Sequence, residues 1–121
     1  MKRILYIEDD ATNAFVVVKL LERNFDMIHR EDGETGLQLL ATNKVDLVLM
    51  DINLGRGKMD GTETMKRIKA DAALHTLPVI AVTSYALPED ENRFRSQGFD
   101  DYIAKPVDRN TLLTRIGKFL A

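Results

Sequence analysis

The sequence contains no cysteine and no apolar run long enough to span a membrane. Without cysteine the chain has no disulfide framework, no thiolate zinc site and no thiol nucleophile. The 17 basic residues nearly balance the 19 acidic ones, so the formal net charge of -2 gives no overall attraction for nucleic acid or for an anionic membrane. The sequence therefore predicts no cysteine chemistry, no direct contact with nucleic acid and no membrane association.

The beginning and the length of the chain indicate its class. Met1-Lys2-Arg3-Ile4 leads directly into an apolar run, without the longer apolar segment of a signal peptide, so we expect a cytoplasmic protein. At 121 residues with 45% hydrophobic content, the chain is long enough for one complete core and short for two ordinary domains. We expect residues 1–121 to form a single domain.

Short apolar runs alternate with segments of helical periodicity along the whole chain. The runs cover residues 4–7, 45–50, 79–82 and 102–104, with a weaker run at 27–29. Alternation of this kind predicts βαβ units, a parallel sheet and right-handed crossovers. Since we count five strands and five helices, the chain is predicted to be an α/β protein built on a five-stranded parallel sheet.

Several helices carry start and stop signals. A third helix is expected over about residues 61–73. Pro88 suits a first helical turn and Gly98 suits a C-terminal cap, which predicts a helix over about residues 88–97. Asp108 is a plausible N-cap for the last helix, because its side chain can accept a hydrogen bond from a free backbone N–H.

Polar residues follow four of the predicted strands at the point where each ends. They are Glu8 and Asp9 after the first strand, Asp51 after the third, Thr83 after the fourth and Lys105 after the fifth. Ligand sites of open α/β sheets lie at the carboxyl ends of the strands, so we expect these side chains to converge. Three acids, one hydroxyl and one ammonium suit a divalent cation and a phosphoryl group.

This pattern resembles the receiver domain of two-component response regulators, and the resemblance covers the whole chain. It rests on Glu8-Asp9, Asp51, Thr83-Ser84 and Lys105-Pro106, which follow the first, third, fourth and fifth predicted strands. The dipeptide Asp60-Gly61 and the sequence of residues 98–106 support it. The resemblance implies a single receiver domain over residues 1–121. Its fold would be the flavodoxin-like, chemotaxis-regulator-like (βα)5 doubly wound fold, with helices on both faces of the sheet.

The resemblance also implies a set of site residues. Asp51 would be the phosphoacceptor that takes a phosphoryl group from a phosphohistidine donor. Mg2+, for which Mn2+ can substitute, would be held by Glu8, Asp9, Asp51 and the main-chain carbonyl of Asn53. Lys105 would pair with Asp51 at rest and with a phosphoryl oxygen afterwards.

Thr83 and Tyr102 correspond to the switch pair of the family. The Thr83 hydroxyl is expected to move toward the phosphorylated Asp51, and the Tyr102 ring would then turn into the space it leaves. The implied partners are a histidine kinase or a histidine phosphotransferase as donor and a downstream protein as target. The protein would be a monomer or a phosphorylation-dependent dimer, either standing alone or as part of a hybrid kinase.

Two other functions fit part of this pattern. A magnesium-dependent phosphatase of the haloacid dehalogenase type also uses an Asp nucleophile, a Thr or Ser and a Lys. Such enzymes carry Asp-x-Asp on their first strand, whereas Asp51-Ile52-Asn53 follows the third. A phosphate-independent interaction scaffold is disfavoured because every site residue is present. We therefore expect a switch that promotes only its own phosphorylation and dephosphorylation, and not a turnover enzyme.

Two smaller features are interpreted separately. His29 and His75 are expected to lie away from the strand-end site and to have no function. Phe15, Val16 and Val18 extend apolar character beyond the inward face of the first helix. Two interpretations stay open for them, docking of a four-helix-bundle phosphodonor or partial burial against the last helix.

Overall fold

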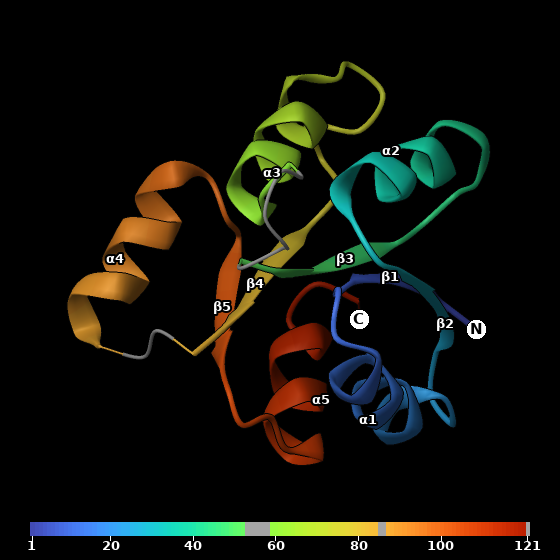
Figure 1. Ribbon diagram of the computed structural model, residues 1–121, viewed down its shortest axis with the longest axis vertical. Coiled ribbons are helices and arrows are strands. Elements are labelled where there is room, and N and C mark those ends of the chain that lie inside the picture. Colours follow the sequence, from blue (N-terminus) through green and yellow to red (C-terminus); the bar gives the residue numbers. More distant parts are fainter. Residues whose placement is uncertain (53–58, 85–86, 121) are drawn as a thin grey trace.

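The computed structural model describes residues 1–52, 59–84 and 87–120 (Figure 1). Within these residues five strands and five helices alternate, as the sequence predicts. The strands are β1 (Arg3–Ile7), β2 (Asp26–Arg30), β3 (Leu47–Asp51), β4 (Val79–Thr83) and β5 (Asp101–Ala104); the helices are α1 (Ala11–Leu21), α2 (Gly33–Thr42), α3 (Gly61–Ala70), α4 (Pro88–Gln97) and α5 (Arg109–Gly117). In this part of the chain, none of the helices has the length and apolar character needed to cross a membrane.

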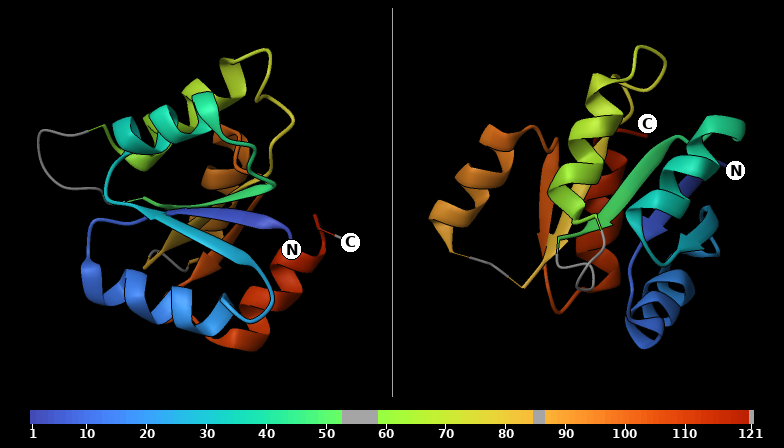
Figure 2. Two further views of the ribbon diagram at one scale, coloured as in Figure 1. Left: turned by 90° about the vertical axis from the view of Figure 1, so that its right-hand side faces the viewer. Right: turned by 45° about the horizontal axis from the view of Figure 1, so that its top comes forward.

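The strands form one parallel sheet in the order β2-β1-β3-β4-β5. The chain moves from β1 outward to β2, returns past β1 to β3, and continues in the opposite direction to β5. Right-handed crossovers therefore place the helices on both faces. Figure 2 shows α1 and α5 below the sheet and α2 and α3 above it. This is the flavodoxin-like doubly wound order, and the predicted fold class is confirmed.

The hydrophobic core consists of two layers, one on each face of the sheet. All five residues of β3 are buried, and they alternate between the two layers as the pleat requires. Leu47 and Leu49 pack with α1 and α5, whereas Val48 and Met50 pack with α2, α3 and α4. The sheet is thus covered on both sides and only its edges and strand ends can carry polar groups.

Aspartates begin four of the helices. Asp10, Asp32, Asp60 and Asp108 each accept a hydrogen bond from the backbone N–H three residues later. Such a bond satisfies one of the N–H groups that a helix leaves free at its start. The prediction of Asp108 as an N-cap is confirmed.

The third helix is shorter than predicted, while α4 ends as expected. α3 stops at Ala70, because the Asp71 side chain accepts from the backbone N–H of Ala73 at 2.7 Å and stabilises a turn in place of another helical turn. α4 is followed by Gly98, whose φ of 125° is accessible to glycine and rarely to other residues. The helix boundary at Gly98 is therefore the one that the sequence indicates.

Gly61 lets the start of α3 approach the end of β3 closely. A Cβ atom at this position would overlap the backbone carbonyl oxygen of Asp51 and lie 3.1 Å from the Cα of Ile52. The backbone N–H of Gly61 also donates to the Ile52 carbonyl at 3.4 Å. The absence of a side chain at Gly61 thus sets the distance between α3 and the strand that ends in Asp51.

Candidate functional site

The register of the sheet brings the predicted site residues to one edge. Ile7 of β1 lies opposite Met50 of β3, so the next residues, Glu8 and Asp51, lie side by side. Asp51 lies opposite Val82 of β4, and Thr83 is the following residue. Because parallel strands all point the same way, residues distant in sequence meet where the strands end.

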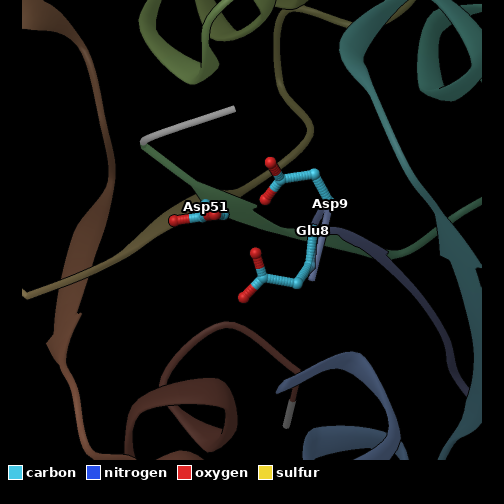
Figure 3. A group of neighbouring side chains, drawn as sticks. All are labelled: Glu8, Asp9 and Asp51. Atoms are coloured by element: carbon cyan, nitrogen blue, oxygen red, sulfur yellow. The ribbon is translucent and has the colours of Figure 1, made fainter. Parts of the chain in front are cut away.

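Three carboxylates converge at this edge. Figure 3 shows the side chains of Glu8, Asp9 and Asp51 directed toward one common space. One carboxylate oxygen from each lies within 4.8 Å of the others. Glu8 is 1% exposed and Asp51 4% exposed, whereas Asp9 lies at the surface. Oxygen ligands at such spacing suit a hard divalent cation, so this acidic cluster can hold a metal ion.

Lys105 provides the positive charge of the site. Its backbone N–H donates to the Thr83 carbonyl at 2.7 Å, which holds the residue after β5 beside the end of β4. Its Nζ atom lies 3.1 Å from Glu8 Oε1 and 3.3 Å from Asp51 Oδ1. One ammonium therefore contacts two buried carboxylates, as the prediction of a Lys105–Asp51 pair requires.

The crowding of acids perturbs the ionisation of the site. Burial, together with the hydrogen bond and the negative charge of Glu8, raises the pKa of Asp51 to about 7, although Lys105 acts in the opposite direction. Burial also opposes ionisation of Glu8, but contacts with Asp51, Lys105 and Tyr6 outweigh it and lower the pKa of Glu8. Of the two carboxyl groups, Asp51 is therefore the one that takes up a proton first as the pH falls toward neutral.

Lys105 stays charged in this environment. Its partial burial disfavours the ammonium, but the charges of Asp51 and Glu8 outweigh burial and raise the pKa of Lys105. Two carboxylates facing one ammonium leave an excess of negative charge, which a proton neutralises when no cation is present. A divalent cation would displace that proton and occupy the same space.

Two further residues, which were not predicted to belong to the site, contact it. The Tyr6 hydroxyl donates to Glu8 Oε1 at 3.0 Å from a fully buried side chain. The His29 Nε2 atom donates to the main-chain carbonyl of Glu8 at 2.6 Å. The expectation that His29 lies away from the site is wrong, because β2 pairs with β1 in a register that sets His29 opposite Tyr6. His75 lies in the turn after α3, where its ring hydrogen-bonds the Ala72 carbonyl.

Thr83 and Tyr102 occupy neighbouring strands. Thr83 is the last residue of β4, is buried, and lies opposite Ala104 of β5. Tyr102 lies two residues earlier on β5, opposite Ala81, and is partly buried against the hydrophobic layer that includes α3 and α4. Asn53, predicted to offer a main-chain carbonyl to the metal, lies outside the described residues.

The apolar residues of α1 form a surface beside the site. Phe15 is 62% exposed and Val16 is 44% exposed, while Val18 is half-buried. Val16 also lines a hollow of about 140 Å³ together with Lys105 and Val107. Burial against α5 therefore does not explain the apolar character of Phe15 and Val16, and the surface they form continues to the lysine of the site.

The protein is an α/β protein with a doubly wound parallel sheet. Its acidic cluster and lysine lie at the carboxyl ends of the strands, at the point where the strand order reverses, and they form a site that can bind a cation. The family model of the response regulator receiver domain matches residues 4–117, and the chain belongs to this family. The chain is thus a receiver domain of two-component, phosphoryl-accepting signalling.

Known relatives cover almost the same length. The polar-differentiation response regulator DivK of Brucella anthropi is 34% identical over 120 residues, which are 98% of this chain and 96% of that protein. A putative response regulator from Chloroflexus aurantiacus superposes with a TM-score of 0.90 at 27% identity, covering 98% of this chain and 97% of that one. The receiver domain of a sensor histidine kinase from Pseudomonas aeruginosa superposes with a TM-score of 0.87 at 28% identity, covers 98% and 97%, and holds a magnesium ion in its active-site cleft.

Proposed function

We propose that residues 1–121 form one receiver domain in which Asp51 accepts a phosphoryl group and the resulting aspartyl phosphate changes partner binding. The observation that carries the proposal is the position of the Lys105 ammonium, 3.3 Å from Asp51 Oδ1 and beside the acidic cluster. A buried carboxylate that shares its space with a cation site and a lysine can act as a nucleophile toward phosphorus, since phosphoryl transfer depends mainly on position and on charge neutralisation.

The transfer step requires few groups of the protein. A carboxylate oxygen of ionised Asp51 forms the new O–P bond while the P–N bond of a phosphohistidine breaks. The electron pair of that bond stays on the imidazole nitrogen, which takes up a proton. Lys105 then turns from the Asp51 carboxylate to a phosphoryl oxygen, where its charge stabilises the product. The chain promotes this transfer and the later hydrolysis on itself, and it does not turn over a separate substrate.

The residues at this edge fit a magnesium ion. Glu8, Asp9 and Asp51 supply oxygen ligands within reach of one another, and Asn53 would add its main-chain carbonyl. Magnesium accepts a few carboxylates and keeps several waters, for which the exposed side of Asp9 leaves access to solvent. When bound, Mg2+ or Mn2+ would neutralise the charge on the transferring oxygens.

Thr83 and Tyr102 would transmit the change to the surface. The Thr83 hydroxyl lies one residue beyond Val82, the residue opposite Asp51, so new phosphoryl oxygens on Asp51 would be within a short side-chain movement. Movement of Thr83 toward Asp51 would free space for the Tyr102 ring on the neighbouring strand. A hundredfold change in partner affinity needs about 2.7 kcal/mol of difference between the two states, which one or two charge-assisted hydrogen bonds can supply.

The phosphodonor would be a phosphohistidine of a histidine kinase or of a histidine phosphotransferase. Exposed Phe15 and Val16 lie on α1, and the hollow lined by Val16 reaches Lys105. An apolar surface that reaches Lys105, which is paired with the acceptor, suits a helical donor protein that must bring its histidine to Asp51. A downstream protein, or a second phosphorylated copy of the chain, would bind the face around α4, β5 and α5.

Intact-mass measurement tests the acceptor role. The protein is incubated with acetyl phosphate and Mg2+, beside Asp51→Asn and a chelated sample. One added phosphoryl group in the unaltered protein, absent from both controls, is the expected result. A generic phosphate ester is supplied in parallel, and steady release of phosphate over many turnovers would contradict the proposal.

A second probe separates a short-lived phosphate from an inactive site. Beryllofluoride binds as a stable analogue of the aspartyl phosphate, so it should alter the protein even when no covalent adduct survives. Absence of both the adduct and beryllofluoride binding would overturn the proposal in favour of a phosphate-independent scaffold.

A further inference from the structure

The hydroxyl of Tyr6 forms a buried hydrogen bond with the acidic cluster. Tyr6 lies on β1, with no exposed surface, and its hydroxyl donates to Glu8 Oε1 at 3.0 Å. Glu8 itself is 1% exposed, and its main chain is fixed by hydrogen bonds from its N–H to Arg30 and from His29 to its carbonyl. Glu8 is therefore held both at its main chain and at one carboxylate oxygen before any ligand arrives.

Two contacts of the Glu8 carboxylate fall on the same oxygen. Oε1 accepts from the Tyr6 hydroxyl and also from Lys105 at 3.1 Å, which accounts for both lone pairs of that atom. Lys105 has a flexible stem and also contacts Asp51, so it can leave Glu8 when a phosphoryl group arrives. Tyr6 has no such alternative, because its ring is packed in the core beside α1 and α5.

We propose that Tyr6 is a positioning residue that restricts Glu8 to a single oxygen toward the cation and thereby makes the site prefer Mg2+ to Ca2+. Calcium commonly takes both oxygens of a carboxylate and six to eight ligands, whereas magnesium requires a tight octahedron with single oxygens and waters. With Oε1 held by Tyr6, Glu8 presents its second oxygen alone. This inference rests on the proposed magnesium site and concerns the selectivity of that site.

The test is the variant Tyr6→Phe, which keeps the ring and removes the hydroxyl. Mg2+ and Ca2+ are titrated separately into the unphosphorylated protein at pH 8, with heat as the readout. Loss of an outer hydrogen bond to a metal-binding carboxylate should weaken Mg2+ binding by about tenfold. Ca2+ binding should weaken less, because Glu8 Oε1 then keeps only the contact with the flexible Lys105 and can turn toward the cation, so the ratio of Mg2+ to Ca2+ affinity falls.

A second variant distinguishes positioning from a general effect on the fold. Glu8→Ala removes the carboxylate through which Tyr6 acts, so Tyr6→Phe should cause no further loss of Mg2+ affinity in that background. Unfolding of both single variants is followed in chelator to show that each remains cooperatively folded. An equal loss in both backgrounds would mean that Tyr6 acts by packing, and would overturn the proposal.

The remaining outcomes are equally decisive. Unchanged Mg2+ and Ca2+ affinities in Tyr6→Phe would overturn the selectivity proposal and leave the proposed function intact. Failure of the unaltered protein to bind Mg2+ would instead overturn the magnesium site of the proposed function, and the selectivity proposal with it.

Discussion

The Nζ atom of Lys105 lies 3.3 Å from Oδ1 of Asp51, although 54 residues separate the two in sequence. The same ammonium lies 3.1 Å from Glu8, so it is shared between two carboxylates that are almost fully buried. One cation cannot neutralise both anions. The edge of the sheet that carries the site is consequently stabilised by whatever removes the excess negative charge, whether a proton or a metal ion.

Removing the acceptor carboxylate should stabilise the metal-free protein. Asp51→Asn leaves Lys105 and Glu8 as a balanced pair, so the free energy of unfolding at pH 8 in chelator should rise by about 1 kcal/mol. The same variant should lose phosphoryl uptake. Urea unfolding measures the first effect and intact mass the second. Asp26→Asn, at the opposite edge of the sheet, is the matched control; it removes only an exposed ion pair with Arg3, so it should lower the free energy of unfolding by less than about 0.5 kcal/mol and leave phosphoryl uptake intact. A less stable Asp51→Asn protein would contradict the charge argument.

Stabilisation by magnesium should increase with pH. Burial and Glu8 raise the pKa of Asp51 from 3.8 to about 7 in the folded protein, so the folded state binds this proton more tightly than the unfolded chain. That contribution is complete below about pH 4 and is lost as the pH rises through 7. Mg2+ replaces the proton, and its effect on the unfolding temperature should therefore be larger at pH 8 than at pH 5.

Thermal unfolding in Mg2+ and in chelator at both pH values measures this difference. The pKa of Glu8 is lowered in the folded protein, so ionised Glu8 stabilises the fold above its unfolded pKa of 4.5, and this stabilisation is lost as the pH falls below that value. A lower limit of pH 5 keeps Glu8 ionised in both measurements. Equal stabilisation by Mg2+ at pH 5 and pH 8 would show that Asp51 does not carry the proton.

The Thr83 hydroxyl should be required for switching and dispensable for folding. Thr83→Val keeps the shape of the buried side chain at the end of β4 and removes its hydrogen-bonding group. The variant should still take up one phosphoryl group from acetyl phosphate. The NMR resonances of the Tyr102 ring should shift on addition of beryllofluoride in the unaltered protein and stay in place in the variant. Equal shifts in both proteins would exclude Thr83 from the switch.

Two glycines offer a matched test of how closely α3 approaches the site. A Cβ at Gly61 would overlap the Asp51 carbonyl, whereas a Cβ at Gly117, at the end of α5, meets nothing within 4 Å. Gly61→Ala should lower the free energy of unfolding by about 2 kcal/mol and slow phosphoryl uptake. Gly117→Ala should raise it by about 0.5 kcal/mol, because alanine loses less entropy in a helix. Urea unfolding compares them, and equal effects would argue against the close approach.

Asp101 lies at the start of β5, away from the strand ends that carry the site, and should contribute strongly to stability. Its carboxylate is 2% exposed and accepts from Arg95 of α4 and from Arg115 of α5, each at 2.8 Å. Asp101→Asn leaves both guanidinium groups without this anion and should cost about 2 kcal/mol. Glu91→Gln removes a partly exposed partner of Arg95 and should cost less than about 0.5 kcal/mol. The free energies of unfolding of the two variants, measured in urea, should therefore differ. Similar values would show that the buried contact contributes no more than the partly exposed one.

Much of this protein could be predicted from local sequence patterns. Apolar runs of three to six residues separated by helical segments predicted the alternation of strands and helices. Glu8, Asp9, Asp51 and Lys105 were identified because each follows such a run, and parallel strands necessarily end at one edge. The end of α3 was predicted three residues too late, since Asp71 can continue a helix or cap a turn and the periodicity does not distinguish them.

The contacts between strands could not be predicted in this way. The fold class and the set of polar residues that meet could be predicted from the amino-acid sequence, because strand direction and strand ends follow from local hydrophobic patterns. The contacts of Tyr6 and His29 with Glu8, and of Arg95 and Arg115 with Asp101, became evident from the folded chain. These contacts depend on the register and packing of segments far apart in the chain, and a shift of one residue in register would turn the strand residues Tyr6, His29 and Asp101 to the other face of the sheet.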